Sequence, residues 1–347
     1  MSRVILKVGY RCNNRCRFCH SANLQGIPEL PEAALVDRIR EARSAGFHGV
    51  VLSGGEPGIR KDLLRAATLA RSLGLAFGMI SNGRMFSYRA LVDGLAARGM
   101  DYAYLSLHGA DPGTHDALVG IEGAQVQSLA GIRNAARHPG IRVTANTVVV
   151  SRNLDRLRAV VELLAPIPRV RIKLSSVEPR GAVLEHREEI PTPAAAAAAM
   201  RDALEHGIRL GLPRTRLAWD GLPFCMMDGW LDRFADLFTD DLVSIREADE
   251  DFFPLVDYRN MARRPDCRGC LIHDECRGTW SRTWGIFPEA AVAPITGGRS
   301  NSFNLVPTGE SYPAGDLCPV RAQVAAGGAA PGWRTVHRVR DGRLESL

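Results

Sequence analysis

Short apolar segments alternate with amphipathic helical segments over residues 3–211, and this alternation limits the folds that the chain can adopt. It predicts the α/β class, with β/α units around a parallel sheet. The expected strands are residues 3–9, 49–53, 76–81, 102–107, 142–150 and 170–175. The expected helices are residues 32–45, 61–73, 88–98, 123–137, 154–164 and 193–211. Six such units suggest a partial (β/α)6 TIM-type barrel, although a doubly wound sheet would show the same alternation.

Three cysteines follow the first expected strand, in the segment Cys12-Asn-Asn-Arg-Cys16-Arg-Phe-Cys19. Three thiolates at this spacing can bind three of the four irons of a 4Fe-4S cluster and leave the fourth iron open. Buried or disulfide-bonded cysteines are the alternative interpretation. The spacing therefore predicts an iron–sulfur centre with a position for another ligand.

A glycine-rich turn follows the second expected strand, in Ser53-Gly54-Gly55-Glu56-Pro57. Two glycines and a carboxylate at such a turn can approach a ligand's amine closely. The turn and the cysteine triplet, at this separation, resemble the radical S-adenosylmethionine (SAM) enzymes. The resemblance covers about residues 3–180.

The resemblance implies a mechanism and a set of cofactor contacts. In this family SAM binds the open iron, and an electron from the reduced cluster cleaves SAM to a 5'-deoxyadenosyl radical. On this analogy Cys12, Cys16 and Cys19 bind the cluster, and Phe18 packs against the adenine. The turn residues that would hold SAM, chiefly by its methionyl amine, are Gly54, Gly55, Glu56 and Pro57.

Further candidates follow the expected strands, because functional groups gather at the C-terminal ends of parallel strands in either architecture. Those that could contact SAM or substrate are Ser81, Asn82, Ser106, Asn146, Ser175, Glu178 and Arg180. Strand-end capping is the alternative for Ser81, Asn82 and Ser106. Arg180 is the candidate for an anion, since a guanidinium can bind a carboxylate with two hydrogen bonds; its alternative is a surface salt bridge. His108 is a candidate catalytic residue, with a hydrogen-bonded packing role as its alternative.

A second cysteine group, Cys267-Arg-Gly-Cys270-Leu-Ile-His-Asp-Glu-Cys276, lies beyond residue 211, between Cys225 and Cys318. Its spacing resembles the twitch and SPASM extensions of radical SAM enzymes, which carry auxiliary iron–sulfur clusters. Five of the 8 cysteines remain after the triplet, so the count allows one auxiliary 4Fe-4S cluster. We therefore expect a radical SAM barrel over residues 1–211 and a small, cysteine-rich twitch/SPASM-like domain over residues 212–347.

Cys225 is the expected fourth ligand of this auxiliary cluster, because it opens the extension as the first ligand of such domains does. Cys318 is then a free thiol and a candidate catalytic residue, since a free cysteine near the barrel mouth could donate a hydrogen atom to a substrate radical. In one alternative Cys318 is the ligand and Cys225 is free; an inert buried thiol is another. A structural zinc site would use the same four thiolates.

The charge pattern of the sequence indicates which partners the protein surface can bind. The net charge of +6 reflects arginine, since Lys7, Lys61 and Lys173 are the only lysines, and we interpret it as codon bias in preference to a polyanion-binding surface. Nucleic-acid binding is not expected, because no basic run is interleaved with aromatic residues. The acidic residues 236–253 predict a solvated surface helix or loop, and residues 336–347 a hairpin turned by Asp341-Gly342.

The N-terminal segment lacks the apolar stretch of a signal peptide, and no apolar run of about 18 residues occurs anywhere. These patterns predict a cytoplasmic protein with no membrane partner. Cysteines clustered at short spacings in that compartment indicate metal binding in preference to disulfides, since the cytoplasm keeps thiols reduced.

The resemblance implies an enzyme that abstracts hydrogen from a substrate, with a flavodoxin- or ferredoxin-type protein as external electron donor. Oxidation or rearrangement of a small natural-product intermediate is the first prediction. Modification of a ribosomally synthesised peptide, by crosslinking, thioether formation or epimerisation, is the second; a strand beginning by residue 3 leaves no room for the N-terminal peptide-recognition domain of many such enzymes. A non-catalytic iron–sulfur or zinc protein is the third, although such a protein needs no amine-binding turn.

Overall fold

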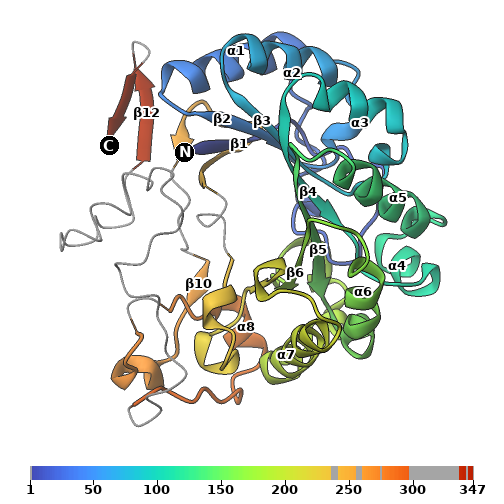
Figure 1. The fold of residues 1–347 in the computed structure, drawn as a ribbon. Coiled ribbons are helices and arrows are strands. Elements are labelled where there is room, and N and C mark those ends of the chain that lie inside the picture. Colours follow the sequence, from blue (N-terminus) through green and yellow to red (C-terminus); the bar gives the residue numbers. More distant parts are fainter. Residues whose placement is uncertain are drawn as a thin grey trace.

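Eight parallel strands form the central sheet, in the order β7-β6-β5-β4-β3-β2-β1-β8. The structure is a computed structural model that describes residues 2–235, 241–254, 260–273, 276–296, 336–340 and 343–346. The sheet curves, and its helices lie along the convex side (Figure 1). This arrangement confirms the predicted α/β class and partial barrel.

All six predicted strands are present in the sheet. They are β1 (Arg3–Lys7), β2 (Gly49–Ser53), β3 (Ala76–Ser81), β4 (Met100–Ser106), β5 (Arg142–Val149) and β6 (Val170–Ser176). Each pairs in parallel with its neighbours in sequence order. Their C-terminal ends therefore meet at one edge, where the predicted site residues follow them.

The six predicted helices also form, with ends that differ from the expected ranges by up to three residues. They are α1 (Glu32–Ser44), α2 (Leu63–Ser72), α3 (Arg89–Ala96), α5 (Ala124–Ala136), α6 (Leu157–Leu164) and α7 (Pro193–Arg209). A seventh helix, α4 (Pro112–Val119), was not predicted. Asp111 caps its first turn through a 2.9 Å bond from the Thr114 N–H, and Gly120 ends it in the left-handed conformation.

Two strands lie at the edges of the sheet and were not predicted. Strand β7 (Leu217–Asp220) pairs with β6, and β8 (Leu242–Arg246) pairs with β1. The expectation of a solvated helix or loop over residues 236–253 is wrong for β8. Leu242, Val243 and Ser244 are buried, in a short run between the carboxylates that pairs with β1 with one irregularity at Val243.

Alternate side chains of each strand face opposite sides of the sheet, which divides the core into two parts. On β1, Val4 and Leu6 belong to the large core that includes residues of the helices. Ile5 packs with Val51, Tyr102 and Leu242 in a separate apolar cluster. By the same alternation this cluster lies on the concave side, within the lumen of the partial barrel.

The C-terminal part of the chain forms short elements. Strands β10 (Met261–Ala262) and β11 (Thr279–Trp280) pair antiparallel, and α8 (Ser281–Ile286) follows them. The predicted hairpin is confirmed as β12 (Val336–Arg340) and β13 (Arg343–Ser346), which pair antiparallel. Strand β12 also pairs with β9 (Phe253–Pro254), and the turn at Asp341-Gly342 lies outside the described residues. Among the helices that the structure describes, none is both long enough and apolar enough to cross a membrane.

Candidate active site

The cysteine triplet lies on the loop that leaves the C-terminal end of β1. Cys12, Cys16 and Cys19 are free thiols, each partly exposed. Burial raises the pKa of all three, and the charges of Cys19 and Cys12 raise that of Cys16 further. The three thiols are thus close enough to interact electrostatically, and iron would replace their protons on binding.

The glycine turn after β2 is bonded to this loop. The N–H of Gly55 donates to the carbonyl of Gly9 at 2.9 Å, and that of Glu56 donates to the carbonyl of Arg11 at 2.9 Å. A Cβ atom on Gly54 would lie 2.1 Å from the Gly9 oxygen, and one on Gly55 would lie 2.2 Å from the Arg11 oxygen. Only glycine permits this approach, so the two glycines are needed for the loop as well as for any ligand.

Glu56 joins the turns after β2 and β3. Its side chain is 2% exposed, and Oε1 accepts hydrogen bonds from the Gly58 N–H at 2.7 Å and from Ser81 Oγ at 2.8 Å. Oε2 accepts from the Asn82 N–H at 2.7 Å. Burial raises the pKa of Glu56 and these hydrogen bonds oppose that effect. The predicted residues Glu56, Ser81 and Asn82 are therefore brought together, and Pro57 begins the short turn that contains Gly58.

Polar residues of the later strands meet at the same edge of the sheet. Ser106 lies opposite Asn146 in the β4–β5 register, and Ser175 Oγ donates to Asn146 Oδ1 at 2.8 Å. Lys173 lies two residues before Ser175 on β6, and therefore on the same face of the sheet. Its Nζ atom is 2.6 Å from Asp220 Oδ2 and 5.4 Å from the centre of the Tyr104 ring. The three predicted residues thus adjoin a buried ion pair.

Sequence reasoning missed Lys7, Lys173 and Asp220 as site residues. Lys7, on β1, is 9% exposed, and burial lowers its pKa while the charges of Glu247 and Cys19 raise it. The composition contained a signal. The chain has 44 lysine and arginine residues, and only three of them are lysines, two of which are Lys7 and Lys173. Lysine in place of arginine indicates a position that requires a compact ammonium group.

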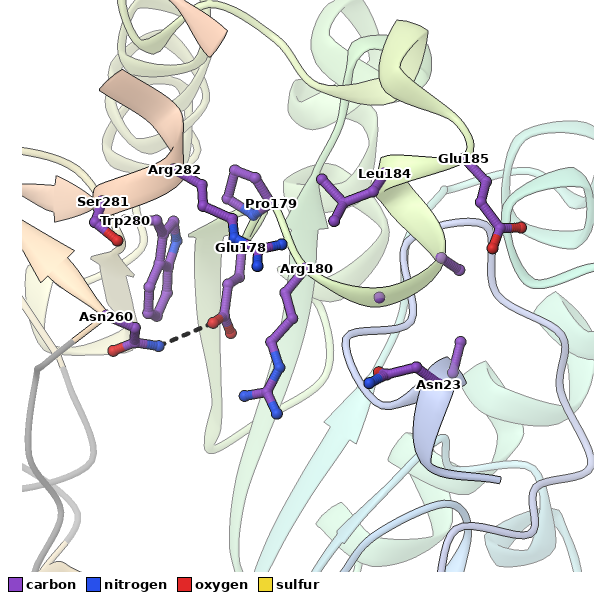
Figure 2. A pocket seen from close by; sticks show the side chains of 13 residues that line it. Asn23, Glu178, Pro179, Arg180, Leu184, Glu185, Asn260, Trp280, Ser281 and Arg282 are labelled. Atoms are coloured by element: carbon purple, nitrogen blue, oxygen red, sulfur yellow. Dashed lines mark hydrogen bonds between the residues drawn. The ribbon is translucent and has the colours of Figure 1, made fainter. Parts of the chain in front are cut away.

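A large cavity opens beside the cysteine loop. Its volume is about 750 Å³, and the segment that follows β6, including Glu178 and Arg180, forms one wall (Figure 2). Asn260 and Trp280, of the C-terminal part, line a second wall beside Glu178. Asn260 Nδ2 donates to Glu178 Oε1 at 2.8 Å, and Trp280 Nε1 donates to the carbonyl of Ser176 at 3.3 Å. Two hydrogen bonds therefore join the walls.

His108 and Phe18 pack together beside the triplet. Their ring centres are 4.7 Å apart, in an edge-on arrangement. The Nδ1 atom of His108 accepts the Val148 N–H at 3.1 Å, and burial holds the pKa of His108 well below its ordinary value. These contacts are those expected if His108 is a hydrogen-bonded packing residue, the alternative to a catalytic role. They also fix the position of the Phe18 ring.

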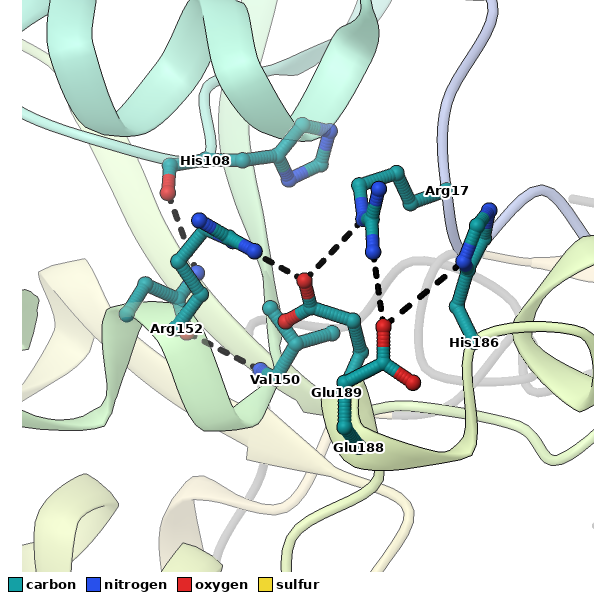
Figure 3. A network of polar contacts seen from close by, with 8 residues as sticks. Arg17, His108, Val150, Arg152, His186, Glu188 and Glu189 are labelled. Atoms are coloured by element: carbon teal, nitrogen blue, oxygen red, sulfur yellow. Dashed lines mark hydrogen bonds and ion pairs between the residues drawn. The ribbon is translucent and has the colours of Figure 1, made fainter.

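Charged residues tie the triplet to the loop after β6 (Figure 3). Arg17 lies between Cys16 and Phe18, and its Nε donates to Oε1 of Glu189 at 3.1 Å. Arg152 Nε donates to the same oxygen at 2.9 Å. The cysteine loop is thus fixed by a carboxylate that is 172 residues away in sequence.

Comparison with known proteins identifies the domain that contains the triplet and the glycine turn. Residues 6–164 match the model of the radical SAM superfamily. The chain carries a radical SAM domain. A PqqA peptide cyclase of Streptomyces rochei is 29% identical over 243 residues, which are 65% of this chain and 64% of that protein. An AdoMet-dependent heme synthase of Methanosarcina barkeri is 31% identical over 182 residues, which are 52% of each protein.

The chain spans less than two thirds of the length of these relatives. A similar solved structure is that of Streptococcus suis SuiB bound to S-adenosylmethionine, with a TM-score of 0.57 and 15% identity over 76% of this chain and 62% of that chain. This likeness shows that the radical SAM domain has the fold of that enzyme.

The residues of the radical SAM domain fit the 4Fe-4S cluster that this family uses. The donor set consists of three free thiols on one loop. The Asn14 N–H lies 3.4 Å from Cys12 Sγ, and Asn82 Nδ2 lies 3.8 Å from it, so both can donate to a thiolate there. In the described parts of the chain, no group of three or more His, Cys, Asp or Glu side chains is arranged to hold a metal ion. A cluster needs no such group, because each cysteine binds a different iron.

The second cysteine group lies beyond the matched radical SAM segment. Cys225, Cys267, Cys270 and Cys276 line one small cavity. The N–H groups of Phe224 and Gly278 donate to Cys276 Sγ at 3.5 and 3.4 Å. Burial raises the pKa of Cys225 and Cys276, and the charges of the neighbouring thiols raise it further. These donors and this proximity fit an iron–sulfur or a zinc site; Cys318 lies outside the described residues.

Proposed function

We propose that the protein cleaves SAM reductively at a 4Fe-4S cluster held by Cys12, Cys16 and Cys19, and that the resulting 5'-deoxyadenosyl radical abstracts hydrogen from a substrate. The radical SAM domain supports this proposal, since its triplet and glycine turn adjoin at the C-terminal edge of the sheet. A cluster held by the three thiolates would supply one electron to the sulfonium of SAM. We propose a flavodoxin- or ferredoxin-type donor for that electron.

We propose that Gly54, Gly55 and Glu56 form the site for the methionyl amine, with the Glu56 carboxylate holding the turn in shape through its three donors. We assign Phe18 to the adenine and His108 to the positioning of Phe18. Pro57 belongs to the same turn. Candidates for the carboxylate or ribose of SAM are Ser81, Asn82 and Ser106, and Asn146 and Ser175 are candidates for a contact with SAM or substrate.

The observation that carries the proposed site of reaction is the position of the 750 Å³ cavity between the two cysteine groups. On one side, the Ala182 N–H donates to the carbonyl of Cys19 at 2.9 Å. On the other side, Trp280 lies four residues after Cys276, whose Sγ accepts the Gly278 N–H. A substrate held here would lie beside both proposed clusters.

We propose that Cys225, Cys267, Cys270 and Cys276 bind one auxiliary 4Fe-4S cluster, with structural zinc as the alternative occupant. The shared cavity of these four residues supports Cys225 as the fourth ligand. An auxiliary cluster could accept the electron that remains on the substrate after hydrogen abstraction, which an oxidation requires. A site of this kind needs reduced cysteines, so we propose a cytoplasmic location.

Two substrate classes fit this site. A peptide is supported by the PqqA peptide cyclase relatives and by the openness of a cavity lined by exposed residues such as Asn23, Glu185 and Asn260. A small natural-product intermediate is supported by the relatives named heme synthases, whose name denotes a small-molecule product. Both would be oxidised, rearranged or crosslinked after loss of one hydrogen atom.

The test is the formation of 5'-deoxyadenosine by anaerobically reconstituted protein with SAM and dithionite. We expect the wild-type protein to form it slowly without substrate. A variant with Cys12, Cys16 and Cys19 replaced by Ala should form none. The proposal fails if protein with a full N-terminal cluster forms no 5'-deoxyadenosine, which would support a non-catalytic iron–sulfur protein.

A further inference from the structure

Two arginines line the 750 Å³ cavity without any partner among the described residues. Arg180 follows β6, and Arg282 lies in α8. Neither guanidinium forms a hydrogen bond or an ion pair with a described residue. Figure 2 shows Arg282 reaching from α8 toward Glu178 and Arg180 extending from the segment after β6, and both line the same cavity. Most other arginines of this region are engaged; Arg17 and Arg152, for example, both bind Glu189.

The position of Arg180 is fixed by the cysteine loop. The next residue, Gly181, has a φ of +66°, and a Cβ atom there would lie 2.3 Å from the carbonyl oxygen of Cys19. The Ala182 N–H donates to that same oxygen. Arg180 is therefore held directly beside the loop that carries the triplet, and a group bound to it would lie close to the site of radical formation.

The position of Arg282 is fixed by the C-terminal part. The preceding residue, Ser281, donates its N–H to the carbonyl of Asn260 at 2.7 Å. Trp280, one residue earlier, is bonded to Ser176 and presents a partly buried indole to the cavity. Two cations without partners among the described residues are suited to a carboxylate, which a guanidinium can bind with two hydrogen bonds.

The charged residues that line the cavity are of both signs. They are the cations Arg180 and Arg282 and the anions Glu178 and Glu185. Glu178 is bonded to Asn260 and remains near the arginines, whereas Glu185 lies at the far end of the view. Two cations against one nearby carboxylate leave an excess of positive charge, which attracts an anion.

We propose that Arg180 and Arg282 bind a carboxylate group of the substrate and so orient the substrate against the cysteine loop. This inference rests on the proposed function, because it takes the cavity to be the substrate site. The carboxylate can belong to an acidic side chain of a peptide or to a small organic acid. Arg180 then binds an anionic group of the substrate. The sequence had left open this role and that of a surface salt bridge.

The test is binding of small carboxylate probes to anaerobically reconstituted protein in the presence of SAM, measured by ligand-observed NMR. The peptide-like probe is acetyl-Gly-Glu-Gly-amide, with acetyl-Gly-Gln-Gly-amide as its uncharged match. The small-acid probe is butyrate, which carries one carboxylate, with butyramide as its match. We expect at least one acid to bind about tenfold more tightly than its amide, since charge-assisted hydrogen bonds are about twice as strong as neutral ones. The preferred acid identifies the source of the carboxylate.

Variants separate this site from general charge effects. Arg180→Gln and Arg282→Gln should each weaken binding of the preferred acid about fivefold or more, and Arg180→Lys should restore part of the loss. Arg43→Gln, at an exposed arginine in the last turn of α1, is the matched control and should bind the acid as the wild type does. Iron content and the absorbance of the clusters report whether each variant is folded.

The inference is overturned if neither acid binds more tightly than its amide, or if the double variant Arg180→Gln, Arg282→Gln binds both acids normally. The proposed function is tested separately by 5'-deoxyadenosine formation in the wild-type protein. Protein that cleaves SAM but does not distinguish acid from amide refutes only the carboxylate site. Protein that binds the acid but never cleaves SAM refutes only the radical reaction.

Discussion

Arg17 and Glu189 form an ion pair that connects the cysteine loop to the segment after β6, with Arg17 Nε 3.1 Å from Glu189 Oε1. The Glu189 side chain is 2% exposed, and Arg152 binds the same oxygen. Arg17 also reaches Glu188, whose side chain is 61% exposed. The buried carboxylate and the exposed one thus contact the same arginine in very different surroundings, which makes them a matched pair for mutation.

We expect Glu189→Ala to lower the free energy of unfolding by about 2 kcal/mol, toward the low end for a broken buried pair, because both arginines are partly exposed and can return to water. The same change should lower the iron bound by the triplet, since Arg17 is adjacent to Cys16. Glu188→Ala should change stability little and leave iron content unchanged, because exposed ion pairs contribute little. Anaerobic denaturant titration and iron analysis measure both; equal effects in the two variants would contradict a positioning role for Glu189.

A second prediction concerns Gly54. Gly54→Ala would place a methyl group against the Gly9 carbonyl, at a φ of +128°, so we expect a loss of about 3 kcal/mol or more and failure to assemble the N-terminal cluster. Gly74→Ala is the control, because Gly74 also has a positive φ, of +70°, but no atom lies within 4 Å of the added Cβ. It should cost about 1 kcal/mol and retain the cluster. Similar losses in both variants would show that backbone strain alone, without the clash, explains the need for Gly54.

The strands whose pattern is local were predicted closely from sequence. Strands β2 and β3 have the expected bounds, because each is a short apolar run with turn residues on both sides. Strand β8 was missed because its pairing is long-range: Arg3 pairs with Leu242. The turn after β8 is held by Arg38 of α1, which donates to the carbonyls of Glu247, Ala248 and Glu250. No local pattern encodes contacts over about 200 residues.

The residues of the candidate site also divide into those that a local sequence pattern predicts and those whose role depends on long-range contacts. The spacing of Cys12, Cys16 and Cys19 is local, so sequence alone indicated their chemistry. The use of Glu56 as a bridge was not predictable, since its donors Ser81 and Asn82 come from the next strand. The cavity arginine Arg282 had no sequence signal, because its role depends on how the C-terminal part lies against the segment after β6.

A third prediction separates the two candidates for the fourth auxiliary ligand. Replacing Cys270 and Cys276 with Ala should remove about four irons per chain, the content of one 4Fe-4S cluster, and block turnover while sparing some SAM cleavage. Cys225→Ala should lower iron content in the same direction, because Cys225 shares the cavity of the other three cysteines. Cys318→Ala should retain all iron. Iron loss in Cys318→Ala, with full iron in Cys225→Ala, would exchange their roles, and zinc in place of iron would refute the auxiliary cluster.

The fourth prediction follows from a buried histidine pair. The backbone N–H of His108 donates to His115 Nδ1 at 3.0 Å, and the backbone N–H of Val148 donates to His108 Nδ1. Protonation of either Nδ1 would place a proton against an N–H donor. Burial lowers the pKa of His115 to about 4, and burial together with His115 holds the pKa of His108 well below its ordinary value.

A histidine whose folded pKa is lowered stabilises the protein above its unfolded pKa, and that contribution is lost as the pH falls through the window between the two values. For His115 the window extends from about 6.5 in the unfolded chain to about 4. Within it the unfolded chain binds one more proton, so the free energy of unfolding should fall by up to about 1.4 kcal/mol per pH unit for each histidine. Denaturant titrations at several pH values from 7.5 downward, to about pH 5.5 where clusters survive, measure this slope. His115→Asn, which keeps an acceptor for the His108 N–H, should reduce the slope by about one proton; an unchanged slope would show that other groups cause the acid sensitivity.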